Sequence, residues 1–148
     1  MRHDGAGRRF EFLGEVNGVT IADDYAHHPT ELEATLRAAR EMDYKRVWAV
    51  FQPFTYTRTQ MLLDDFARVL QIADKVVMTE IMGSRERAED YAVRTKDLAA
   101  KVPGSVWYDT FDEVVDHVMK NARPGDLVIT LGCGDIYKAA KKMVAWKA

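Results

Sequence analysis

The sequence RVWAVFQ, residues 46–52, is apolar almost without interruption. Strands that meet water on one face alternate apolar and polar residues, whereas strands of a parallel sheet covered on both faces do not. KVVMT at 75–79 and DLVITL at 126–131 have the same character. We therefore expect three buried parallel strands at these positions, with a further short strand at 105–108.

Helical patterns lie between these strands. We expect helices at 29–42, at 58–73, at about 92–101, after Thr110 and from about Asp135. Thr30 with Glu33, and Thr110 with Glu113, have the spacing of capping boxes, which place two of the helix starts. Strands alternating with helices predict a single α/β domain, Rossmann-like, with three layers and a mostly parallel sheet.

A hairpin signal precedes the alternating pattern. RFEFLGEV at 9–16 and VTIADDY at 19–25 flank Asn17-Gly18, and both turn residues tolerate the positive φ of a type I′ turn. An antiparallel hairpin is therefore expected before the parallel strands. Residues 1–7 (MRHDGAG) are interpreted as a flexible start or the remnant of a linker, and residues 8–148 as the domain.

Composition narrows the class of protein. The formal net charge is −2, so the chain lacks the basic surplus that sequence-independent nucleic-acid binding requires. The single cysteine, Cys133, excludes an internal disulfide, and no apolar run approaches the roughly 18 residues of a membrane span. We expect a cytoplasmic globular domain with neither nucleic acid nor membrane as a partner.

DDYAHHPT, residues 23–30, stands where ligands of parallel sheets usually bind, beyond the carboxyl end of a strand. Carboxylates such as Asp24 accept hydrogen bonds from sugar hydroxyls, and imidazoles such as His27 can donate to phosphate oxygens. The cluster therefore suits a nucleotide or another phosphorylated ligand. Alternatively, the aspartates finish the hairpin and the histidines simply begin a helix. A metal site is disfavoured, because adjacent histidines point apart and no HxH or HExxH spacing is present.

Two further loops follow buried strands. QPFTYTRT at 52–59 places Arg58 near a helix start, where a guanidinium can bind a carboxylate or phosphate in a bidentate manner; a plain surface arginine is the alternative. LGCGDIYK at 131–138 carries two glycines that allow a ligand to approach the backbone, or that merely make a tight turn. The charged run at 85–90 is typical of a solvated loop.

Taken together, DDYAHHPTE, FQPFTYTRT and LGCGDIYK resemble the C-terminal domain of the Mur ligase family, and most of all its alanine-adding members. The likeness extends from about Arg8 to the last helix. It implies a three-domain enzyme that joins L-alanine to UDP-N-acetylmuramate in peptidoglycan synthesis, through an acyl phosphate made with ATP. The resemblance assigns ATP phosphates and magnesium mainly to a central P-loop domain. It therefore implies that this domain alone is inactive and needs the N-terminal and central domains as partners.

The resemblance also implies roles for single residues. Asp24 matches the carboxylate that takes the ATP ribose, and Tyr25 and His27 match positions near the nucleotide and the incoming amino acid. Arg58 matches an arginine near the alanine carboxylate or the reacting phosphate, so Arg58 and His27 are the catalytic candidates. The remaining candidates on the L-alanine side are Thr55, Gly132 and Gly134.

One departure from the family pattern concerns charge. Many members have His-Arg where this chain has Phe54-Thr55, so a second arginine is missing here. Arg85 or Arg87 is the candidate to replace its charge. Two other functions stay open at the level of sequence: a free-standing nucleotide-binding regulatory module, and a flavodoxin-like or Rossmann-like redox domain, although no dinucleotide fingerprint supports the second.

Overall fold

The computed structural model describes residues 10–147. The strands are β1 (Glu11–Val16), β2 (Val19–Asp24), β3 (Arg46–Phe51), β4 (Lys75–Thr79), β5 (Val106–Tyr108) and β6 (Asp126–Leu131). The helices are α2 (Pro29–Arg40), α3 (Tyr56–Met61), α4 (Leu63–Leu70), α5 (Thr95–Ala99), α6 (Phe111–Asn121) and α7 (Tyr137–Val144), with a 3-10 turn η1 (Ala88–Asp90). None of the helices in this range is long and apolar enough to cross a bilayer.

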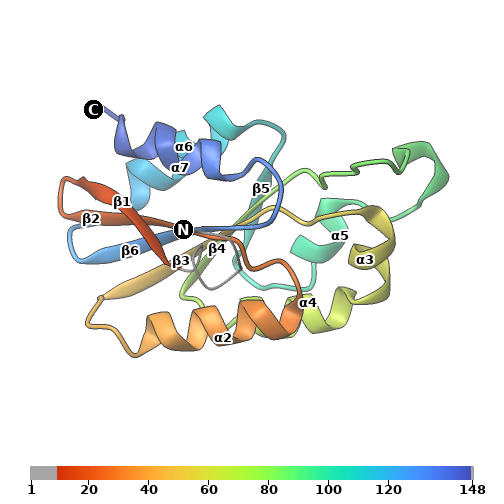
Figure 1. The fold of residues 1–148 in the computed structure, drawn as a ribbon, viewed down its shortest axis with the longest axis horizontal. Helices are drawn as coiled ribbons and strands as arrows, with labels where there is room; N and C mark the ends of the chain where they lie inside the picture. The colour runs from red at the N-terminus through yellow and green to blue at the C-terminus, as the bar shows by residue number, and fades with distance from the viewer. Residues whose placement is uncertain (1–9, 148) are drawn as a thin grey trace.

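The six strands form one sheet in the order β1-β2-β6-β3-β4-β5. Only β1 is antiparallel to its neighbour; every other pairing is parallel. Figure 1 shows α6 and α7 over one face of the sheet and α2 and α4 over the other. The predicted three-layer α/β fold with a leading hairpin is therefore confirmed.

The apolar run of β3 is explained by its two faces. Trp48 and Val50 belong to the core beneath α6 and α7, whereas Val47, Ala49 and Phe51 belong to the core beneath α2 and α4. Each of these five side chains is almost completely buried. A strand with a core on both sides has no position left for a polar residue, which is why its sequence does not alternate.

The hairpin turn is also as predicted. Asn17 and Gly18 have φ values of 53° and 83°, as a type I′ turn requires. A side chain at position 18 would place its Cβ 2.8 Å from Pro124, so glycine is needed there for space as well as for φ. The irregularity in β1 between Phe12 and Gly14 was not anticipated.

Several predicted helix boundaries are wrong, and the helix expected at about 92–101 is the short α5, Thr95–Ala99. The helix expected at 58–73 is two helices, α3 and α4, because Leu62 leaves helical geometry with φ −111° and ψ 22°. It also starts earlier, since Thr55 caps α3 through a bond from the Arg58 N–H to its hydroxyl. The capping box of α2 is formed by His28 and Glu31 rather than by Thr30 and Glu33.

The position of Pro29 explains the shifted capping box. Proline is favoured at the first helical position because it has no N–H to satisfy there. With Pro29 at that position, His28 becomes the cap and accepts from the Thr30 N–H at 3.3 Å. The predicted box at Thr110 and Glu113 is confirmed for α6.

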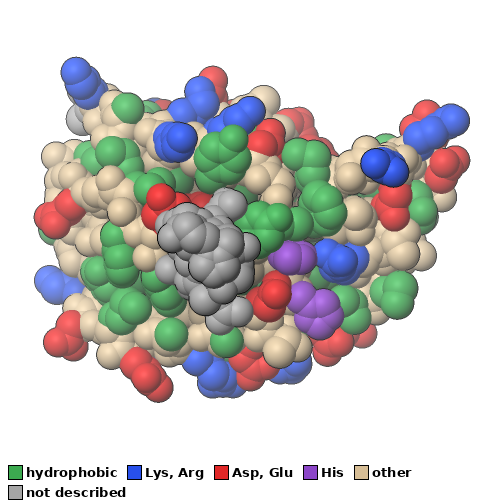
Figure 2. Space-filling model, viewed as in Figure 1, with side chains coloured by type: hydrophobic (Ala, Val, Ile, Leu, Met, Phe, Trp, Pro, Cys, Tyr) green, Lys and Arg blue, Asp and Glu red, His purple; other side chains and the backbone are tan. Residues whose placement is uncertain are grey.

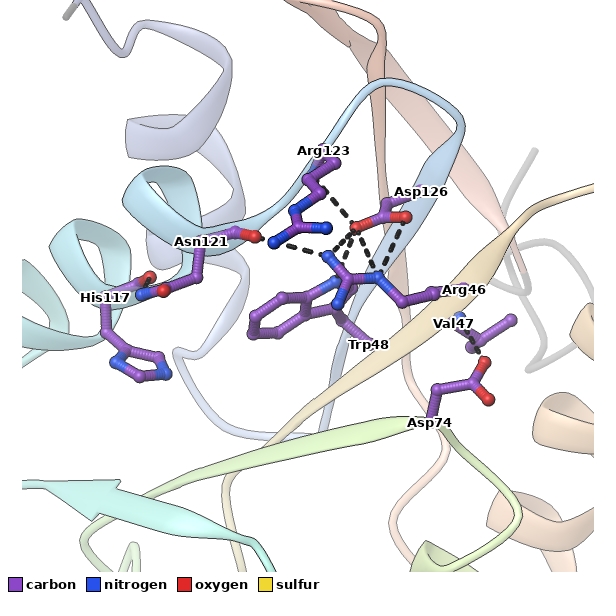
Figure 3. A network of polar contacts seen from close by, with 8 residues as sticks. All are labelled: Arg46, Val47, Trp48, Asp74, His117, Asn121, Arg123 and Asp126. Atoms are coloured by element: carbon purple, nitrogen blue, oxygen red, sulfur yellow. Dashed lines mark hydrogen bonds and ion pairs between the residues drawn. The ribbon is translucent and has the colours of Figure 1, made fainter.

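Asp126 links β3 to β6 at the end of the sheet where these two strands begin. It is 1% exposed, and its Oδ2 accepts from the Arg46 guanidinium at 2.8 Å, the Trp48 indole at 2.9 Å and the Arg123 N–H at 2.9 Å. Figure 3 shows these donors converging on the carboxylate. Because Arg46 and Asp126 are also register partners, the network fixes the alignment of the two strands where both begin.

These bonds change the acidity of Asp126. Burial alone would raise the pKa of this carboxyl, but the hydrogen bonds from Arg46, the Arg123 N–H and Trp48 outweigh it and hold the pKa below its ordinary value. Asp126 is therefore an ionised carboxylate inside the fold at neutral pH.

Candidate active site at the carboxyl edge of the sheet

The three motifs picked out in the sequence end on three neighbouring strands. DDYAHHPT follows β2, QPFTYTRT follows β3 and LGCGDIYK follows β6, which lies between β2 and β3. Leu131 at the end of β6 pairs with Asp24 on one side and with Phe51 on the other. The predicted site residues, which lie between positions 24 and 134 of the sequence, are thereby brought to the same end of the sheet.

Asp24 lies inside the domain. Its side chain is completely buried; one oxygen accepts from the Ala26 N–H at 2.9 Å, and the other accepts from the Phe10 N–H at 3.2 Å and the Thr35 hydroxyl at 3.1 Å. These bonds hold the turn after β2 against the start of β1 and against α2. The predicted ribose contact stays a prediction, and a ribose would have to compete with three internal donors.

Asp24→Ala is expected to lower the free energy of unfolding by about 2–3 kcal/mol, because it leaves buried donors without an acceptor. Urea denaturation without nucleotide measures this. Thr35→Val removes only one of the three partners and should cost about 1 kcal/mol. Unchanged stability in Asp24→Ala would contradict the scaffold role and favour a purely ligand-binding one.

His27 is held in one orientation by its own loop. Its Nδ1 lies 3.1 Å from the Tyr25 carbonyl oxygen and its backbone N–H donates to Glu31 at 3.1 Å. Since a carbonyl can only accept, Nδ1 carries the proton. The ring also packs edge-on against Tyr25, with centroids 5.7 Å apart. The side chain remains 22% exposed, so Nε2 is the nitrogen left to meet a ligand.

Arg58 lines a pocket of about 390 Å³ together with His28, Thr55, Thr57, Met61 and Leu62. No acidic residue lines this pocket. Within residues 10–147 the Arg58 guanidinium has no hydrogen bond or ion pair, so its charge is available to an anion. Figure 2 shows two histidine patches side by side with a Lys/Arg patch next to them on this face.

The backbone at Thr55 is strained. Its φ of 65° lies in the left-handed region, which β-branched residues rarely adopt. The conformation is held by a bond from the Thr55 N–H to the Met82 carbonyl at 2.8 Å and by bonds from both the N–H and the hydroxyl of Thr59 to the Thr55 carbonyl. Strain of this kind clusters at functional sites. In this domain the strained residue is the N-cap of α3, the helix that carries Arg58.

The loop after β6 meets both other loops. Burial raises the pKa of the Cys133 thiol, the Arg58 charge opposes that shift, and the Glu31 charge adds to it. Gly132 donates its N–H to the Asp24 carbonyl at 3.3 Å and has φ 148°. A Cβ at Gly134 would lie 2.6 Å from the Gln52 side-chain oxygen. Packing and backbone conformation thus explain why glycine is present at both positions. The predicted contact of Gly132 and Gly134 with L-alanine stays a prediction.

Comparison with known families identifies the domain. The sequence model of the family described as "Mur ligase, glutamate ligase domain" matches residues 8–134. The chain belongs to the Mur ligase family. UDP-N-acetylmuramate–L-alanine ligase of Acetivibrio thermocellus is 44% identical over 97% of the chain. The chain spans about a third of the length of the curated relatives it matches, 32% of that enzyme and 31% of its Lachnospira eligens counterpart.

Solved structures of Mur ligases have the same fold. A domain from a Haemophilus ducreyi protein, described as a UDP-N-acetylmuramate:L-alanyl-γ-D-glutamyl-meso-diaminopimelate ligase, is 27% identical with a TM-score of 0.71, and the match covers 93% of this chain and 98% of that one. UDP-N-acetylmuramate-alanine ligase of Thermotoga maritima, 23% identical, has a TM-score of 0.74 over 93% of this chain and 29% of its own.

One interaction in this Mur ligase domain was missed in the sequence. Glu86, expected in a solvated run, accepts hydrogen bonds from the Tyr56 and Thr57 N–H groups and from the Thr57 hydroxyl, and the Thr57 bonds hold its pKa below the ordinary value. It docks the segment carrying Arg85 and Arg87 onto the start of α3. No local sequence pattern could predict this contact, because Glu86 and Tyr56 are 30 residues apart.

Among the described residues, no group of three or more His, Cys, Asp or Glu side chains could hold a metal ion. The described residues therefore offer no cluster of three ligands for magnesium by themselves.

Proposed function

We propose that this domain is the C-terminal domain of a UDP-N-acetylmuramate–L-alanine ligase, which joins L-alanine to the sugar-linked carboxylate with ATP. The observation that carries the proposal is the 44% identity over nearly the whole chain to the Acetivibrio thermocellus enzyme of that name. The accessible Arg58 at the edge where β2, β6 and β3 end supports it.

Arg58 is proposed to bind the carboxylate of L-alanine or the reacting phosphate. A guanidinium offers parallel N–H donors that match either group, and this one has no competing acid in its pocket. If the carboxylate of L-alanine binds to Arg58, the amino group of the same molecule is left free to turn toward the acyl phosphate. Thr55 would contribute to this binding by orienting α3 through its strained backbone, since its side chain carries no charge.

On the nucleotide side, Tyr25 and His27 are proposed to line the site, with His27 presenting Nε2. Asp24 keeps its proposed place at the ribose, and it also holds the turn that carries Tyr25 and His27. Magnesium and the ATP phosphates are proposed to be held by other domains of the enzyme. Acyl-phosphate formation needs those groups fixed in place.

A chimeric enzyme tests the proposal. The last third of the Acetivibrio thermocellus ligase is replaced by this chain, and ATP-dependent attachment of L-alanine to UDP-N-acetylmuramate is measured. We expect activity in the chimera and none in the 148-residue chain alone. Ligation or phosphate release by the chain alone would overturn the assignment, as would a folded chimera that uses ATP but not L-alanine.

Calorimetry separates this proposal from a regulatory nucleotide-binding module. A part of a site completed by other domains should bind ATP and ADP very weakly by itself. Micromolar affinity of the chain alone for ATP would favour the module instead.

A further inference from the structure

Residues 81–94, the segment between β4 and α5, pack against the start of α3, the helix that carries Arg58. Figure 1 shows this segment (green) beside α3 (yellow). Tyr56, the first residue of α3, is 8% exposed and forms a small hydrophobic cluster with Ile81 and Val93 of the segment. This cluster is distinct from the two cores on the faces of the sheet. Part of the packing of α3 therefore comes from this segment.

α3 needs such support because it is short. It has six residues, and isolated helices of fewer than about 12 residues are marginal in water. The first N–H groups of a helix have no acceptor within the helix, so they need one from elsewhere. The Thr55 hydroxyl accepts from the Arg58 N–H at 3.2 Å. The two preceding N–H groups, of Tyr56 and Thr57, take their acceptor from outside the helix.

Glu86 supplies that acceptor. Its Oε1 accepts from the N–H groups of Tyr56 and Thr57, and its Oε2 accepts from the Thr57 hydroxyl. The bond from the Thr57 hydroxyl, followed by the bonds from the two N–H groups, holds the pKa of Glu86 below its ordinary value, so the side chain is a carboxylate at neutral pH. A carboxylate at a helix N-terminus also interacts favourably with the helix dipole. One side chain thus fixes the first turn of α3.

Tyr91 and Arg94 hold the segment against the same helix start. The Tyr91 ring stacks on the Tyr56 ring with centroids 5.6 Å apart, and its hydroxyl lies 3.1 Å from the Thr57 hydroxyl. The Arg94 guanidinium lies 5.6 Å from the Tyr56 ring centroid and donates to the Tyr91 carbonyl at 2.7 Å. These contacts do not involve Glu86, so the segment is expected to stay docked when only the Glu86 carboxylate is removed.

We propose that Glu86 is a positioning residue of the ligase reaction, which fixes the first turn of α3 and thereby holds the Arg58 guanidinium in place for its anion. Glu86 is not among the residues that line the Arg58 pocket, so it acts through Arg58 rather than on the ligand. Thr57 connects the two, because it lines the pocket and bonds to Glu86. The inference rests on the proposed function, since it concerns the anion that Arg58 binds.

The test is a double-mutant cycle in the chimeric ligase, with kcat/KM measured for L-alanine. Glu86→Ala should lower kcat/KM about tenfold, because a displacement on the order of 1 Å in a positioned group can cost up to about 100-fold. In the Arg58→Ala background the same change should cost less than about twofold, since the residue through which Glu86 acts is gone. Glu86→Gln keeps one acceptor oxygen and should stay within about threefold of wild type. The KM for UDP-N-acetylmuramate should not change.

Glu89→Ala is the matched control. Glu89 is an exposed residue of the same segment and pairs with Arg87 at 3.2 Å. Its replacement removes the same charge and should leave kcat/KM unchanged. Melting curves verify that both variants fold.

Amide hydrogen exchange of the 148-residue chain without substrates measures the first turn of α3 directly. Exchange at Tyr56 and Thr57 should become about tenfold faster in Glu86→Ala, because the two N–H groups lose their acceptor. It should stay unchanged in Glu89→Ala.

The proposal is wrong if Glu86→Ala costs as much in the Arg58→Ala background as in wild type, since Glu86 would then not act through Arg58. Unchanged kcat/KM in Glu86→Ala, or an equal loss in Glu89→Ala, would also overturn it. An inactive wild-type chimera would instead contradict the proposed function. In that case, unchanged exchange at Tyr56 and Thr57 in Glu86→Ala would still overturn the role of Glu86 at α3.

Discussion

Asp126→Ala is expected to lower the free energy of unfolding of the domain by about 3–5 kcal/mol. The substitution leaves the Trp48 indole N–H, the Arg123 N–H and the Arg46 guanidinium without their shared acceptor in a site that is 1% exposed at Asp126. Two buried N–H donors then lack an acceptor, and the Arg46 guanidinium, whose side chain is 27% exposed, loses its charged partner. Urea denaturation followed by circular dichroism measures the change.

A matched control separates burial from charge. Asp112→Ala removes an exposed carboxylate that pairs with Lys142 at 3.0 Å, and it should cost less than about 1 kcal/mol. Equal effects of the two substitutions would contradict the account of the Asp126 network.

The pH dependence of the stability that Asp126 contributes follows from the direction of its pKa shift. A carboxyl whose folded pKa is lowered stabilises the fold above its unfolded pKa of about 3.9, and loses that contribution as pH falls through the folded pKa. The stability difference between wild type and Asp126→Asn should therefore be constant above about pH 5 and shrink below about pH 4. A difference that grows on acidification would contradict it.

Arg58→Ala in the chimeric ligase is expected to lower kcat/KM for L-alanine about 100-fold, since one charged partner of a bound carboxylate or phosphate is removed. The guanidinium has no other partner among residues 10–147, so the loss should appear in catalysis and hardly in stability. Steady-state kinetics with L-alanine varied, together with a melting curve, separates the two effects.

Two further variants define the role of Arg58. Arg58→Lys keeps the charge without the bidentate geometry and should recover only part of the activity. Arg37→Ala removes an exposed arginine that pairs with Glu33 on α2 and should leave the kinetics unchanged. If Arg58→Ala leaves both kcat and KM for L-alanine unchanged, Arg58 is a surface arginine.

Much of the architecture could be predicted because it depends on local pattern. The strands β3, β4 and β6 are buried on both faces, and such burial leaves a continuous apolar run in the sequence. Asn17-Gly18 predicted its turn because few residues accept two successive positive φ values. The break at Leu62 could not be predicted, since the apolar spacing of 58–73 continues through it.

The candidate site was predictable in composition but not in arrangement. Asp24, His27 and Arg58 were predicted because ligands of parallel sheets bind beyond the carboxyl ends of the strands and because their motifs resemble those of the Mur ligases. Whether Asp24 faces inward or outward depends on Thr35 and on the Phe10 N–H, which only the folded chain brings to it. The hydrogen bond from Gln52 to Asp135 could not be predicted, because the two residues lie 83 positions apart in the sequence.

By itself, the sequence determined which segments are strands and helices, because hydrophobic period and turn chemistry are local, and it predicted which loops form the candidate site. Only the tertiary structure decided the strand order, which inserts β6, the last strand of the chain, between β2 and β3. Backbone hydrogen bonds between strands do not depend on side-chain identity, so no local pattern could specify that order. The insertion brings LGCGDIYK between DDYAHHPT and QPFTYTRT, and thereby joins three separate loops into one candidate site.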